Sequence, residues 1–114
     1  MEKIELHIVS ALREIISDNF VELKNSRDIT VYLDTPKNKE FGDLSTNIAM
    51  QLAKKLGKSP IEVANIILGS LKKDLNRLPL KELLAYVKIE GPGFINFCLI
   101  EKSLYDGIKE ILKK

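Results

Sequence analysis

The residues of this chain best suited to bind a ligand are an aromatic ring and an amide two positions apart, Phe94 and Asn96. They follow the turn Gly91–Pro92–Gly93, in which the glycines permit backbone angles closed to other residues and the proline fixes φ. Residues 86–90 and 94–99 alternate between apolar and polar types, which predicts a β-hairpin. Because successive strand side chains point to opposite faces, Phe94 and Asn96 share one face. The alternating apolar residues Ile95, Phe97 and Leu99 face the core.

This pair suits single-stranded nucleic acid better than it suits catalysis. An unpaired base can stack on a ring such as Phe94, for roughly 1–3 kcal/mol, while the amide of Asn96 donates to and accepts from its edge. We expect Tyr32 and the cationic loop with Lys37 and Lys39 to extend the same RNA-binding surface. A sheet face covered by another domain explains an exposed Phe94 and Tyr32 equally well.

Groups that could act as catalysts or metal ligands are scattered. The chain has one histidine, His7, and one cysteine, Cys98, and neither has partners spaced as a nucleophile–base pair or a metal site. Asp43 is interpreted as a helix N-cap, whose carboxylate accepts from free N–H groups of the first turn. We therefore expect no catalytic residue and no bound metal.

Length and composition place the chain among soluble globular proteins. It has 114 residues, of which 45% are hydrophobic and 30% charged, so we expect one domain over residues 1–114. No apolar run approaches the ~20 residues of a membrane span, and we expect no membrane partner. A single cysteine suits a reducing compartment, so a cytoplasmic location is expected.

The net charge of +2 says little about partners, but its distribution is uneven. Residues 37–58 hold five lysines and only two acidic residues. A solvated helix face and loop is the simpler interpretation, and contact with phosphate is the alternative.

Local patterns predict helices and strands along the whole chain. In chain order, the patterns predict a helix over 3–20, a strand over 29–33 and an extended piece at 40–41. Two helices follow, one starting at 42–43 and ending before Gly57, and one from the capping box Ser59–Glu62 to about 73. An irregular connection over 74–85 then leads to the two hairpin strands, which are followed by a helix over 101–113. This order, α-β-β-α-α-β-β-α, predicts an α+β two-layer sandwich. Helices would cover one face of a small antiparallel sheet of three to four strands.

Three sequence blocks resemble one known family, the N-terminal additional domain of arginyl-tRNA synthetases. They are Phe41–Gly42–Asp43 running into a helix with Asn47 and Ala49, then Ser59–Pro60–Ile61–Glu62–Val63–Ala64, then Gly91–Pro92–Gly93–Phe94–Ile95–Asn96–Phe97–Cys98–Leu99. The blocks come in the family's order, and the resemblance covers nearly the whole chain. The block from Gly91 to Asn96 is its most specific part.

The resemblance implies a tRNA-binding domain that recognises the D-loop at the outer corner of tRNA(Arg). In the family, the aromatic residue and the asparagine of the last block lie at that contact, and here they are Phe94 and Asn96. Tyr32, Lys37 and Lys39 match no motif of the family. The family's domain precedes a Rossmann-type catalytic domain that activates arginine with ATP.

The chain departs from a whole synthetase because it has no HIGH-like signature, no KMSKS-like loop and no anticodon-binding helical domain. It is therefore interpreted as the excised or separately expressed N-terminal domain of an arginine–tRNA ligase. It would bind tRNA and the catalytic domain of the whole ligase. It would need no cofactor of its own, because ATP and Mg belong to that catalytic domain. The alternative is a structural module that docks on the catalytic domain without reading RNA.

Overall fold

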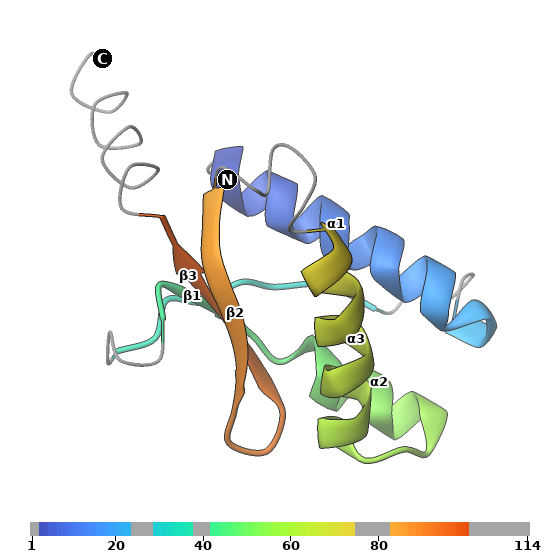
Figure 1. Ribbon diagram of the computed structural model, residues 1–114. Helices are drawn as coiled ribbons and strands as arrows, with labels where there is room; N and C mark the ends of the chain where they lie inside the picture. Colours follow the sequence, from blue (N-terminus) through green and yellow to red (C-terminus); the bar gives the residue numbers. More distant parts are fainter. Residues whose placement is uncertain (1–2, 24–28, 38–41, 75–82, 101–114) are drawn as a thin grey trace.

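The computed structural model describes residues 3–23, 29–37, 42–74 and 83–100 (Figure 1). In chain order its elements are α1 (Lys3–Asn19), the short 3₁₀ helix η1 (Val21–Leu23), β1 (Leu44–Thr46), α2 (Ile48–Leu56), α3 (Pro60–Asp74), β2 (Leu84–Glu90) and β3 (Phe94–Leu99). The expected α+β fold is confirmed.

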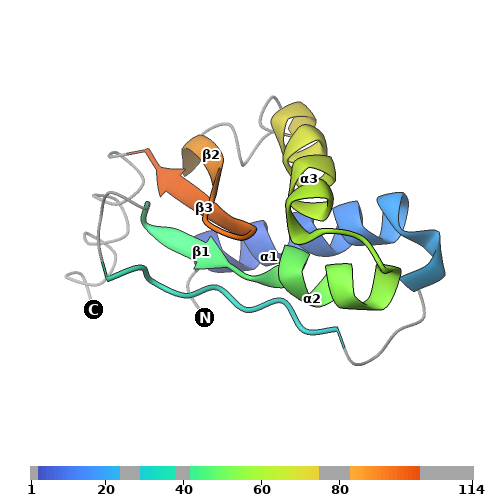
Figure 2. The ribbon, with the colours of Figure 1, turned by 90° about the horizontal axis from the view of Figure 1, so that it is seen from below.

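The sheet is antiparallel with strand order β1-β3-β2, so β3 is its central strand. The helices lie on one side of it, as the two perpendicular views show (Figures 1 and 2). Between these layers, Ile95 and Phe97 of β3 are fully buried. They belong to one apolar core with side chains from all three helices, among them Leu12, Leu52 and Ile67. Because this core anchors alternate residues of β3, the other residues must point to the face away from the helices.

The hairpin turn packs tightly against the start of α3. Gly91 and Gly93 have φ of 56° and 140°, values that favour glycine. A Cβ added at Gly93 would lie 2.9 Å from the Cβ of Pro60. The turn therefore needs a residue without a side chain at position 93, and this contact fixes the hairpin relative to α3.

The predicted boundaries between α2 and α3 are confirmed. Gly57, with φ of 66°, ends α2, and its N–H donates to the carbonyl of Ala53. The hydroxyl of Ser59 accepts from the N–H of Glu62 at 3.1 Å, as an N-cap does.

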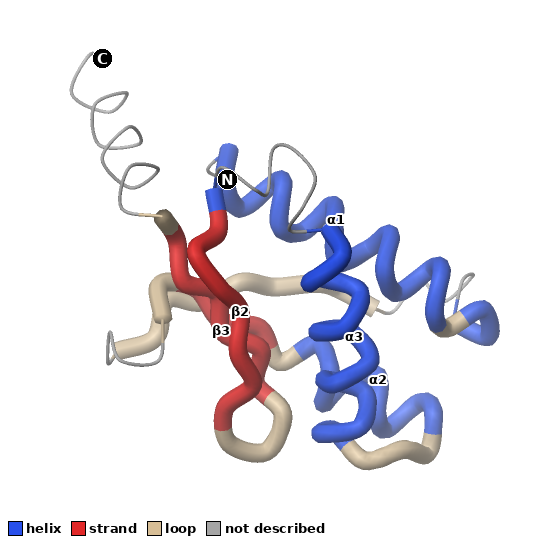
Figure 3. Tube along the Cα trace, in the orientation of Figure 1, coloured by secondary structure: helices blue, strands red, loops and turns tan. Residues whose placement is uncertain are grey.

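The predicted strand over 29–33 is wrong. Figure 3 shows this segment as loop, and just beyond it Asp34 pairs with the sheet through two backbone hydrogen bonds to Ser45 of 2.7 and 2.8 Å. Val31 is buried while Tyr32 is exposed. Ile29 and Leu33 are partly buried and pack against the same core, so the alternation arises from side-chain burial without the backbone pairing of a strand.

The predicted helix start at 42–43 is also wrong, because residues 44–46 form β1 and α2 begins at Ile48. The side chain of Asp43 does not cap this helix; its Oδ2 accepts from the N–H of Leu99 at 2.8 Å. The Asp43 N–H donates to the carbonyl of Phe97 at 2.9 Å. Asp43 thus joins β1 to β3, while Thr46 Oγ1 accepts from the first N–H of α2.

The remaining differences are small. The irregular connection was predicted to reach residue 85, but Leu84 already belongs to β2. The extended piece at 40–41 and the helix over 101–113 lie outside the described residues. Within the described residues, no helix has the length and apolar character needed to span a membrane.

Candidate nucleic-acid interface

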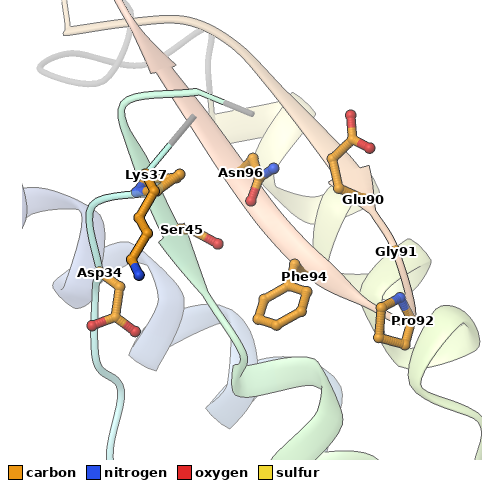
Figure 4. A pocket seen from close by; sticks show the side chains of 9 residues that line it. Asp34, Lys37, Ser45, Glu90, Gly91, Pro92, Phe94 and Asn96 are labelled. Carbon is orange, nitrogen blue, oxygen red and sulfur yellow. The ribbon is translucent and has the colours of Figure 1, made fainter. Parts of the chain in front are cut away.

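A groove of about 540 Å³ lies on the sheet face turned away from the helices (Figure 4). It runs between the segment that precedes β1 and the hairpin turn. Its lining residues are Asp34, Pro36, Lys37, Ser45, Glu90, Gly91, Pro92, Phe94 and Asn96. The groove thus gathers residues from three separate parts of the sequence around the start of β3.

The ring of Phe94 projects into this groove from the first residue of β3 (Figure 4). Its side chain is 40% exposed, as expected from the sequence. A Cβ added at Gly91 would lie 3.8 Å from the Cδ2 atom of the ring, so the turn backs the ring closely. The ring is thus partly exposed and lines the groove, where a ligand could contact it.

Asn96 lines the same groove but is only 2% exposed. Binding of a nucleotide by the pair, as predicted from the sequence, assumes that both side chains project into water, and for Asn96 this assumption is wrong. Because β3 is the central strand, Ser45 and Lys88 stand directly opposite Asn96 on either side. A Cβ at Gly42 would lie 3.5 Å from its Cβ, so the chain before β1 covers it as well.

The Oδ1 atom of Asn96 is buried and has no hydrogen-bond partner among the residues that the structure describes. Leaving a buried acceptor unsatisfied costs roughly 1–3 kcal/mol, and such groups are few in native proteins. A ligand in the groove that donates a hydrogen bond would satisfy this atom. The groove therefore combines an accessible ring with an unsatisfied acceptor.

Charged groups stand on both sides of the groove. Asp34 and Lys37 come from the segment before β1, and Glu90 comes from the end of β2. Lys88 Nζ lies 3.2 Å from Glu90 Oε1, and this hydrogen bond raises the pKa of Lys88. Since Pro36 and Pro92 complete the walls, the groove suits a flat, partly apolar group with a polar edge.

In the part of the chain that the structure describes, no group of three or more histidine, cysteine or acidic residues is placed to hold a metal ion.

Comparison with known families agrees with the resemblance of the sequence blocks. The family model for the arginyl-tRNA synthetase N-terminal domain matches residues 2–99. The chain belongs to this family.

Curated relatives include the arginine–tRNA ligase of Thermotoga maritima, 40% identical over 107 residues that cover 94% of this chain and 18% of that protein. The arginine–tRNA ligase of Listeria monocytogenes is 37% identical over 112 residues, which cover 98% of this chain and 19% of that protein. The chain thus spans about a fifth of the length of these relatives.

A solved structure, the arginyl-tRNA synthetase of Thermus thermophilus, has the same fold. The match has a TM-score of 0.61 and 20% identity, and it covers 88% of this chain and 14% of that one.

The other expected contact residues of this arginyl-tRNA synthetase N-terminal domain are only partly brought together. Lys37 lines the groove, whereas Tyr32 is exposed and does not line it. Lys39 lies outside the described residues. The binding roles of Phe94, Asn96 and these residues stay predictions.

Sequence reasoning did not predict six of the lining residues as contacts, namely Asp34, Pro36, Ser45, Glu90, Gly91 and Pro92, although it placed the last two in the turn. Glu90 could have been found from the register of the predicted hairpin, which places it opposite Phe94. No local signal predicts the bridge between Asp34 and Ser45, which are distant in sequence.

Further along the same face, Tyr86 stands opposite Cys98. A side-chain hydrogen bond to Cys98 raises the pKa of Tyr86. Tyr86 is 51% exposed and lies outside the groove lining, which makes it a useful comparison for Phe94.

Proposed function

We propose that this domain binds tRNA through the groove, which receives an unpaired base of the D-loop at the outer corner of tRNA(Arg). In the whole synthetase this contact would support ATP-dependent arginylation. Family membership supports a role beside tRNA. The observation that carries the proposal is the buried, unpartnered Oδ1 of Asn96 in the same groove as the exposed ring of Phe94.

An unpaired base has the two features that the groove can recognise. Its flat surface would stack on the Phe94 ring, contributing roughly 1–3 kcal/mol. An amino or imino group on its edge would donate to Asn96 Oδ1 and remove the penalty of the unsatisfied acceptor. Lys37 at the rim would face the phosphates on either side of the base.

The domain itself would bind and position tRNA without turnover and without a cofactor. Arginine activation with ATP and Mg would belong to the catalytic domain of the synthetase, in the cytoplasm. A small module with few cationic contacts binds nucleic acid weakly, at about 10⁻⁴–10⁻⁶ M at physiological salt. Tethering to the catalytic domain raises the effective concentration and compensates for this weakness.

The test is the affinity of the chain for a tRNA(Arg) transcript, measured for Phe94→Ala and for the matched control Tyr86→Ala. Both variants remove an exposed aromatic residue from the same sheet face, but only Phe94 lines the groove. Loss of one stacked base predicts a dissociation constant about 5- to 150-fold higher for Phe94→Ala. Equal effects of the two variants would contradict base binding in the groove.

A second candidate is docking on the catalytic domain without RNA readout. Leu6 and Val21 are large apolar residues exposed on α1 and η1, away from the groove lining. Chemical-shift mapping with a D-arm RNA hairpin separates the two candidates. Shifts at residues 91–98 support tRNA binding, and no shifts at low salt support docking.

A further inference from the structure

Three exposed lysines, Lys54, Lys55 and Lys58, lie within five positions at the link between α2 and α3. We call them the lysine corner. Lys58 Nζ lies 4.0 Å from Glu62 Oε1, and both side chains are well exposed, so this ion pair neutralises little of the charge.

The lysine corner adjoins the hairpin turn that carries Phe94. Lys58 comes two residues before Pro60, and Pro60 is the residue on which Gly93 packs. Figure 1 shows the tip of the hairpin and the α2–α3 link at the same end of the molecule. An RNA strand that leaves the groove past the hairpin turn would therefore approach this corner.

The needs of α2 explain only part of the lysine corner. Lys54 and Lys55 lie in the last turn of α2, where cations interact favourably with the helix dipole. The carbonyl of Ala53 there already accepts backbone N–H groups from Gly57 and Lys58. Lys58 itself lies beyond the helix, so dipole compensation does not account for it.

We propose that the lysine corner is a second RNA contact, which binds backbone phosphates that flank the base in the groove. The proposal rests on the proposed function and adds to it a binding site of different chemistry. Lysine binds phosphate as a mobile point charge and carries no sequence information. The corner would hold the RNA strand, while the groove would select the base.

The end of α3 offers a matched control. Lys72 and Lys73 occupy its last turn and are exposed, as Lys54 and Lys55 are in α2. With 15 residues, α3 places them about 20 Å from its first residue, Pro60. A double substitution at either position removes the same net charge.

The experiment compares the chain, Lys54→Ala/Lys58→Ala and Lys72→Ala/Lys73→Ala in binding a tRNA(Arg) transcript between 50 and 200 mM salt. Each lost phosphate contact lowers the slope of log K against log salt by about 0.7 for a single strand. We expect the corner variant to lose about 1.4 in slope and to bind roughly tenfold more weakly at low salt. The control should keep the slope of the unchanged chain.

Equal losses in the two double variants would overturn the lysine corner, because net charge alone would then explain the binding. A corner effect with no effect of Phe94→Ala would support the corner and overturn base binding in the groove. An unchanged chain that binds no tRNA at low salt would overturn both proposals. Melting temperatures of the variants verify that each is folded.

Discussion

The two faces of β3 are built differently, although they alternate along one strand. Ile95 and Phe97 point to the helices and are fully buried among apolar side chains. Phe94 and Asn96 point the other way, where the ring is partly exposed and the amide is buried with Oδ1 unpartnered. Burial alone does not separate the faces, because Asn96 is nearly as inaccessible as Phe97. Hydrogen bonding separates them, since within the described part of the chain only the groove face holds a buried side-chain polar atom that lacks a partner.

The largest effect is expected on the core face. Phe97→Ala should lower the free energy of unfolding by about 3–5 kcal/mol, because it leaves a cavity between sheet and helices. Phe94→Ala is the control and should cost less than about 1 kcal/mol in the same urea denaturation, since the ring is partly exposed. Similar losses in both would mean that the two faces are equally packed.

Next in size is the support of the groove by the hairpin turn. Gly93→Ala should cost about 2–4 kcal/mol, because a Cβ meets Pro60 at 2.9 Å and φ is 140°. Gly57→Ala serves as a control, with a positive φ of 66° and nothing within 4 Å of the added Cβ. Thermal unfolding should show a cost of only about 1–2 kcal/mol there. Equal costs would indicate that backbone strain alone matters at both positions.

The link between β1 and β3 should give an intermediate effect. Asp43→Ala removes a charge-assisted hydrogen bond of 2.8 Å to the Leu99 N–H and should cost roughly 1.5–3 kcal/mol. Asp34→Ala should change stability by less than about 0.5 kcal/mol, because Asp34 pairs through its backbone. Chemical denaturation checks both variants, and a silent Asp43→Ala would refute the link.

The smallest effect on stability is expected at Asn96. Asn96→Leu keeps the number and branching of the side-chain heavy atoms and removes the unpartnered acceptor, so stability should stay equal or rise by up to about 1 kcal/mol. Binding to tRNA should nevertheless fall, because the groove loses its polar group. A stability loss above about 2 kcal/mol would show that this amide supports the fold instead.

Sequence reasoning worked where structure depends on neighbours in the chain. The hairpin from Tyr86 to Leu99, the cap at Ser59 and the helix end at Gly57 each depend on residues a few positions apart. Asp43 failed because its side chain bonds to Leu99, 56 positions away, in preference to the adjacent helix. The sequence predicts that the Asp43 carboxylate accepts a backbone N–H, but it does not predict that the donor is Leu99.

The groove was likewise predictable from the sequence only where it depends on neighbouring residues. Alternation along β3 placed Phe94 and Asn96 on one face, and the structure agrees. The burial of Asn96 could not be foreseen, because it depends on the strand order that puts Ser45 and Lys88 beside it. The strand predicted over 29–33 failed for a related reason, since pairing partners lie outside any local window.

The hydrogen bond from Leu99 to Asp43 has a mechanical consequence. The end of β3 is held on one side by Asp43 and on the other by the bond from the Ile100 N–H to the Leu83 carbonyl, 2.9 Å long. Phe94 stands at the opposite end of the strand, about 17 Å away at 3.4 Å per residue. The strand therefore fixes the distance between Leu99 and a molecule that stacks on the Phe94 ring.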